Sequence, residues 1–196
     1  QQKPMEMNDE LAKELGFDSL EKLRERVKTD IGSDYERISR AIIKRKLMDK
    51  LADAHDFEVP AGMLNNEFDS IWKQIEISKA KGELPEDDKK KTDDQLKKEY
   101  RGIAERRIRL GLLLSEVAEK EKIKVEPTEL RNALTNEARR FPGQEKAVFD
   151  YYTQTQGAME RLRAPILEEK VVDYILSKTK ITDKKIPADD LIKMPQ

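Results

Sequence analysis

Residues able to do chemistry are scarce, because the chain contains one histidine, His55, and no cysteine. Nucleophilic catalysis of the Ser-His-Asp or Cys-His type needs a histidine held by an orienting acid. His55 ends a predicted long helix, a position typical of a capping or surface residue. Metal sites built on His or Cys need several such ligands, and no glycine-rich phosphate loop occurs. We therefore expect no catalytic residue, no cofactor and no metal ion.

Charge is abundant but balanced, with 39 Lys and Arg against 40 Asp and Glu and a net charge of −1. Nucleic-acid binding needs an unbalanced basic surface, so we expect no nucleic-acid partner. The basic run 89–91 follows three acids and is predicted to be a solvated loop. No apolar run reaches the roughly 18 residues of a membrane span, so no membrane partner is expected. Because the chain opens on Gln1, we expect a piece of a longer protein.

Apolar residues that leave the buried stripe of their helix are the remaining candidates for function. Met63 and Ile77 lie off the main apolar face of their helix, and leucines surround the helix at 110–114. Such a surplus either packs between two neighbouring helices or stays exposed for a partner, and both readings remain open. The candidates for contact with a partner are Met63, Phe68, Trp72, Ile77, Leu112, Phe141, Phe149, Tyr151 and Tyr152.

Long helices would position these candidates. Apolar periodicity, capping residues and the scarce Gly and Pro predict the helix boundaries. The segments 83–91 and 178–196 are predicted to be a charged loop and an irregular tail. No alternation typical of strands occurs, so the predicted fold class is all-α. The helices are expected over 18–54, 60–81, 93–122, 127–141, a short stretch around 148–152, and 158–177.

The length of the first helix predicts an elongated molecule. At 1.5 Å per residue, 18–54 would span roughly 55 Å. A compact ball of this chain length would be only about 42 Å across. Unless Gly32 breaks the helix, the long helices must form a body with projecting arms, an arrangement that suits a clamp better than a compact enzyme.

Four segments stand out in the sequence: IIKRKLMDKL at 42–51, FEVP at 57–60, AERRIRLGLLLSEV at 104–117, and 162–176 with LEEKVVDYIL at its end. In their order and spacing they resemble trigger factor, the bacterial ribosome-associated chaperone. Each is a weak motif alone, but together they are specific, and the resemblance covers about residues 8–186. Pro165 departs from the pattern and puts the straightness of the last helix in doubt.

The resemblance implies the C-terminal domain of that family. Its body would be 8–55 and 157–196, with arm one at 56–118 and arm two at 119–156. The implied function is ATP-independent binding of unfolded or nascent polypeptides in a helical cradle, in the cytoplasm. Separately from the resemblance, apolar residues exposed at the arm tips would allow weak self-association. The ribosome would be reached only through an N-terminal domain absent from this chain. Isomerase activity would likewise belong to an FKBP-type domain that the chain lacks, so the chain itself is not expected to be an enzyme.

Two other functions fit the composition. A helical scaffold would bind one folded partner at a single saturable site, without preference for unfolded chains. A periplasmic chaperone similar to SurA would share the helical architecture, and an export signal on the full-length protein would distinguish it.

Overall fold

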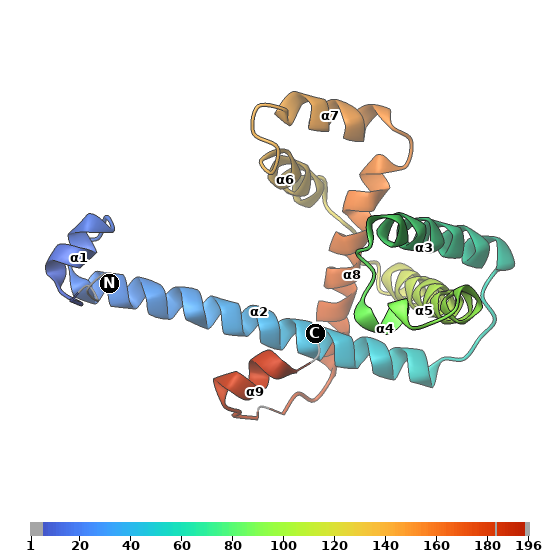
Figure 1. The fold of residues 1–196 in the computed structure, drawn as a ribbon, viewed down its shortest axis with the longest axis horizontal. Helices are drawn as coiled ribbons and strands as arrows, with labels where there is room; N and C mark the ends of the chain where they lie inside the picture. Colours follow the sequence, from blue (N-terminus) through green and yellow to red (C-terminus); the bar gives the residue numbers. More distant parts are fainter. Residues whose placement is uncertain (1–5, 183, 195–196) are drawn as a thin grey trace. The chain divides into compact units, whose positions relative to one another are not determined.

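The computed structural model describes residues 6–182 and 184–194, and every regular element in them is an α-helix (Figure 1). The predicted all-α class is therefore confirmed. The helices are α1 (Asp9–Glu14), α2 (Leu20–Ala54), α3 (Ala61–Lys81), α4 (Glu86–Lys89), α5 (Asp93–Lys120), α6 (Pro127–Ala138), α7 (Glu145–Gln154), α8 (Ala158–Lys178) and α9 (Ala188–Lys193).

The helices belong to two compact units. The first unit takes its described residues from 6–49 and 184–194, and the second is 50–182. The first unit contains α1, most of α2, and α9; the second contains α3 to α8. The helix α2 runs from Leu20 to Ala54 without a break at Gly32. His55 lies just beyond its end, exposed, and its Nδ1 donates to the carbonyl oxygen of Leu51 at 2.9 Å, the capping role expected for it.

Short helices occupy the two segments predicted to lack them. The segment 83–91 contains α4, whose first turn carries Glu86, Asp87 and Asp88, and the tail contains α9. Acids in a first turn stabilise the positive end of the helix dipole, and a proline fixes the start of each helix, at Pro85 and at Pro187. Both predictions of irregular structure were wrong for these residues. The helix α1 was not predicted either.

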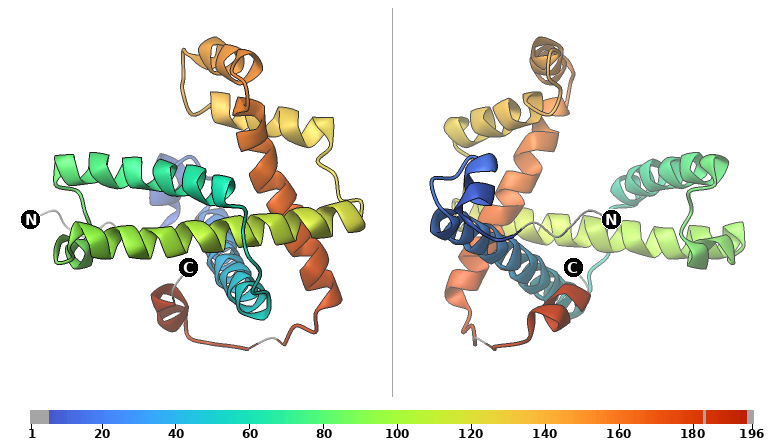
Figure 2. Two further views of the ribbon diagram at one scale, coloured as in Figure 1. Left: turned by 90° about the vertical axis from the view of Figure 1, so that its right-hand side faces the viewer. Right: turned by 60° about the vertical axis from the view of Figure 1, so that its left-hand side comes forward.

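The pair α3 and α5 is an antiparallel hairpin (Figure 2). Gly82 ends α3 in the left-handed conformation at φ 72°, a region that glycine enters at little cost. A capping box begins α5, since the Thr92 side chain accepts from the Gln95 N–H while the Gln95 side chain accepts from the Thr92 N–H. These local signals explain why the sequence predicts correctly where α3 ends and where α5 begins.

The spine of the second unit is α8, which contacts α5, α6 and α7. Its Val171 and Val172 have no exposed surface, and Ala158 at its start is 1 % exposed. The helix continues through Pro165, whose own side chain is exposed. One part of the core of this unit therefore lies along α8, and a second buried group, with Leu84 and Leu96, lies at the turn between α3 and α5.

A polar cluster connects α4 to α5. Asp88, only 8 % exposed, accepts from the Tyr100 hydroxyl at 2.7 Å and from the Lys91 ammonium at 2.9 Å. Lys91 also donates to Glu99 at 2.6 Å. The Tyr100 hydrogen bond, followed by that of Lys91, lowers the pKa of Asp88. The same bond to Asp88, with burial, raises the pKa of Tyr100 to about 12. The run 89–91 is therefore a set of paired side chains, each bound to an acid three residues earlier.

We expect this cluster to make stability fall as pH rises from about 10 to about 12. In the unfolded chain a tyrosine ionises near pH 10, whereas folded Tyr100 keeps its proton to about 12. The folded state therefore binds more protons than the unfolded state across this window. The stability that the Tyr100–Asp88 hydrogen bond contributes is fully present below pH 10 and is lost as pH rises to about 12. Urea midpoints of the wild type and Tyr100→Phe, followed by circular dichroism at pH 8, 10 and 11, should converge as pH rises. Parallel curves would contradict the assignment.

Candidate functional site

The aromatic residues of α3 lie under cationic side chains of α5. The rings of Phe68 and Trp72 stack with centroids 6.1 Å apart and planes 19° apart. The Arg101 guanidinium lies 5.7 Å from the Phe68 centroid, and the Lys97 ammonium lies 5.3 Å from that of Trp72. Cations over aromatic faces are attracted by the ring quadrupole. Both rings are half-buried, so only part of each remains for another molecule.

Hydrogen bonds across the hairpin fix this arrangement. Arg101 donates to the side-chain oxygen of Asn65 at 3.0 Å, and Arg107 donates to Glu67 at 3.0 Å. Within α3, the Trp72 ring nitrogen donates to Glu76 at 2.9 Å. The bonds of Arg101 and Arg107 help to fix the register of α3 against α5, and α3 itself contains no buried residue.

Three other candidates have different surroundings. Met63 and Ile77 are 42 % and 41 % exposed, near opposite ends of α3. Their separation of 14 residues is roughly 21 Å along a helix, and the residues at 66, 67, 70, 73 and 74 that separate them on this face are polar or charged. Leu112 is half-buried beside Leu114, which is 7 % exposed. The exposed candidates of α3 are therefore isolated side chains and do not form a continuous apolar strip.

The other four candidates come together on the hairpin of α6 and α7. Phe141 and Tyr151 are 46 % and 45 % exposed, and Phe149 is 36 % exposed. The rings of Tyr151 and Tyr152 meet edge to face, with centroids 5.2 Å apart. A pocket of about 290 Å³ opens at this place. It is lined by Glu137, Phe141, Gln144, Ala147, Val148, Tyr151 and Tyr152.

The turn between α6 and α7 shapes this aromatic pocket. Gly143 has φ 81°, a conformation that side chains disfavour, and the Gln144 N–H donates to the Phe141 carbonyl oxygen at 3.0 Å. Arg161 donates to the Tyr151 hydroxyl at 3.4 Å. Pockets for drug-sized ligands begin near 300 Å³, so this one suits one or two side chains. It lacks the convergent titratable groups that a catalytic site would need.

A second apolar hollow lies in the first unit, where sequence reasoning placed no candidate. It has a volume of about 460 Å³ and lies between α1 and the first half of α2. Leu23, Val27 and Ile31 belong to the stripe of α2, and periodicity alone cannot separate a buried stripe from an uncovered one. We call this hollow the α1–α2 groove. Its lining residues are Met7, Leu11, Leu15, Leu23, Arg24, Val27, Lys28 and Ile31.

Across 6–182 and 184–194, no group of three or more His, Cys, Asp or Glu side chains could hold a metal ion. No helix within the same ranges combines the length and the apolar character that crossing a membrane requires.

Comparison with known proteins gives a consistent result. Residues 19–177 match the family described as the C-terminus of bacterial trigger factor protein. The trigger factor of Azospirillum brasilense is 51% identical over 193 residues, which are 98% of this chain and 43% of that protein. That of Rhodospirillum rubrum is 48% identical over 97% of this chain and 42% of its own length. That of Rhodospirillum centenum is 46% identical over 99% of this chain and 43% of its own length. The chain thus spans less than half the length of these curated relatives.

Proposed function

This chain belongs to the family of the bacterial trigger factor C-terminus, and from that premise we propose that it is the polypeptide-binding part of an ATP-independent chaperone. Its clients would be unfolded or nascent polypeptides in the cytoplasm. Ribosome binding and peptidyl-prolyl isomerase activity would belong to other domains of the full-length protein. The alternatives of a scaffold for one folded partner and of a periplasmic chaperone find no specific support in the site.

The observation that carries this proposal is the aromatic pocket between α6 and α7. Phe141 and Tyr151 are each about 45 % exposed there, and large apolar side chains exposed next to one another mark interaction sites. An open pocket for one or two side chains suits many apolar segments and is too small to select one ligand.

We further propose that arm one is 56–118 and arm two 119–156, so both arms lie inside the second unit. The body would be 8–55 and 157–196.

The expected binding energies explain how such a chaperone could work without a nucleotide. Covering a few hundred Å² of apolar surface yields roughly 5–10 kcal/mol before losses. Ordering a flexible client offsets much of that gain, so each contact is weak and reversible. Several weak contacts on the two hairpins raise the overall affinity through effective concentration. Release then needs only the loss of a few contacts.

An aggregation assay tests the proposal. A chemically denatured client is diluted into buffer with an equimolar amount of the chain and no ATP, and light scattering is followed. We expect scattering to fall, and we expect no complex with the same client in its native state. As a control, an unrelated folded protein at equal concentration should leave scattering unchanged. Unreduced scattering, with the chain shown to be folded by circular dichroism, would contradict the proposal. Binding to the native client alone would favour the scaffold.

A further inference from the structure

Two side chains of α8 bond to the two sides of the connection between α5 and α6. The Lys170 ammonium donates to the Glu129 carboxylate of α6 at 2.7 Å, and the Tyr174 hydroxyl donates to the Glu121 carboxylate at the end of α5 at 2.6 Å. Lys170 and Tyr174 are four residues apart, so they lie on the same face of α8. We call the connection 121–126 the joint and these two side chains the α8 clasp.

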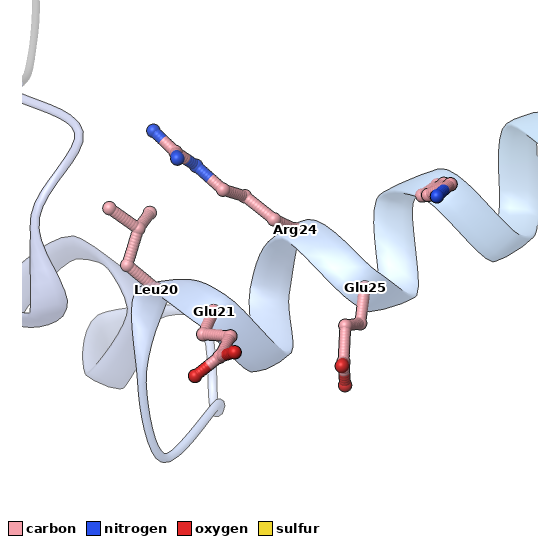
Figure 3. A pocket seen from close by; sticks show the side chains of 5 residues that line it. Leu20, Glu21, Arg24 and Glu25 are labelled. Carbon is pink, nitrogen blue, oxygen red and sulfur yellow. The ribbon is translucent and has the colours of Figure 1, made fainter.

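The α8 clasp differs from the local charge pairs of the chain. Arg163 and Glu160, for example, pair three positions apart on α8 itself. Other charged side chains extend into solvent, and Figure 3 shows Arg24, which lines the α1–α2 groove, on a different side of α2 from Glu21 and Glu25. The two bonds of the α8 clasp instead join residues 41 and 53 positions apart. They therefore constrain how α5 and α6 are placed against α8.

The joint contains an unfavourable backbone conformation. Lys122 has φ 56°, and in 6–182 and 184–194 no other residue except glycine has a positive φ. A side chain in this region crowds the backbone, and glycine normally occupies this position after a helix. The conformation lets the Ile123 N–H donate to the Ala118 carbonyl oxygen at 2.8 Å, which closes the end of α5. Residues strained in this way persist only where surrounding contacts hold them.

Neighbouring groups hold both ends of the α8 clasp in place. The Glu129 carboxylate also accepts from the Glu126 N–H at 2.7 Å. The bond from Lys170, followed by that from Glu126, lowers the pKa of Glu129 and so favours its charged form. The Lys178 ammonium lies 5.5 Å from the centroid of the Tyr174 ring. The Glu129 carboxylate and the Tyr174 ring are therefore each oriented by a second contact besides the bond of the clasp.

We propose that the α8 clasp holds the joint in its strained conformation, and that opening of the clasp lets the α6–α7 hairpin turn about Lys122. The backbone strain favours another conformation of the joint, whereas the two bonds favour the observed one. The side chains of Lys170 and Glu129 are 31% and 36% exposed, and partly exposed pairs contribute modestly. The closed and open joints are therefore close in free energy. The inference concerns the conformation of the chain and does not depend on what the hairpin binds.

Amide hydrogen exchange tests the clasp. The Ile123 N–H loses its acceptor when Lys122 leaves the left-handed region, so its protection factor reports opening of the joint. Lys170→Met with Tyr174→Phe, the clasp variant, removes both polar ends and keeps most of the apolar packing. We expect the protection factor of Ile123 to fall about tenfold. That of Leu114, buried inside α5, should change less than about twofold.

Glycine at the strained position provides a second test. Lys122→Gly removes the crowding of the left-handed conformation, so adding it to the clasp variant should return the protection of Ile123 to within about twofold of the wild type. Lys124→Gly places the same residue in the same joint at a position without a positive φ and should not restore the protection. Arg163→Met breaks only the local pair on α8 and should leave the wild-type protection unchanged.

Spin labels measure the movement of the hairpin. Because the chain has no cysteine, Ser115→Cys on α5 and Lys146→Cys on α7, both at exposed positions, can be labelled selectively. Double electron–electron resonance should give one narrow distance distribution for the labelled chain without further changes. We expect an additional distance in the clasp variant, and we expect Lys122→Gly to remove it.

Four results would overturn the inference. Unchanged protection of Ile123 in the clasp variant would show that apolar packing around Val125, which is 9 % exposed, fixes the joint alone. Equal losses at Ile123 and Leu114 would show a loss of global stability in place of opening at the joint. Restoration by Lys124→Gly as well as by Lys122→Gly would exclude strain at Lys122 as the cause. A single distance distribution in the clasp variant would show that the hairpin does not turn.

Discussion

Replacing Leu96 with alanine is expected to lower the free energy of unfolding of the second unit by about 3 kcal/mol. Among the described residues, Leu96 is one of three large side chains with less than 2 % of their surface exposed, and it lies near the start of α5. On this hairpin α3 has no buried residue, whereas α5 also buries Ala104, Leu114 and Ala118. Leu96 is the largest of these that is almost fully enclosed, so its loss would leave a cavity near the start of α5.

Urea unfolding followed by circular dichroism measures this loss. Ile103→Ala is the matched control, because Ile103 lies two turns further along α5 and is 39 % exposed. We expect it to lose about 1 kcal/mol or less. Equal losses for Leu96→Ala and Ile103→Ala would show that the α3–α5 interface is not packed as described.

Removing the aromatic pocket is expected to have the largest effect on client binding. The double change Phe141→Ser and Tyr151→Ser should weaken binding of a labelled, uncharged aromatic peptide by about tenfold, which corresponds to about 1.4 kcal/mol. Aromatic side chains in pockets carry a large share of binding energy at interfaces, and these two line the pocket of about 290 Å³. Both are more than one-third exposed, so the change should cost little stability.

The control for this variant is Phe149→Ser. Phe149 also lies on α7 and is 36 % exposed, but it does not line the pocket. We expect its replacement to change the peptide affinity less than threefold, a difference well under 1 kcal/mol. An equal loss for Phe149→Ser would mean that general apolar exposure on α7, and not the pocket, binds the peptide.

Helix boundaries were largely predictable because they depend on neighbouring residues. The Thr92 capping box, the left-handed Gly82 and the proline that opens α6 all act within one turn of the helix end. The three helices that were missed are four or six residues long. Helices this short are marginal by themselves and form through contacts made elsewhere in the chain. For α4 one such contact is the hydrogen bond from Tyr100 to Asp88, twelve residues apart.

The candidate site was predictable only as a set of residue types. The sequence singled out Phe141, Tyr151 and Tyr152, yet the pocket they share depends on how α7 folds back on α6. No pattern of neighbouring residues in the sequence indicates that Lys97 lies over Trp72 and Arg101 over Phe68. These contacts depend on how α5 is aligned along α3 in the folded chain.

Sequence patterns alone identify an all-helical chain, most of its helix boundaries and its family. Which apolar side chains remain uncovered depends on the packing of the folded chain. The stripe with Val27 and Ile31 on α2 has the same periodicity as a core stripe, but both residues are 46 % exposed. The physical reason is that a helix is specified by hydrogen bonds and caps within a few residues, whereas burial depends on which distant segments pack against it.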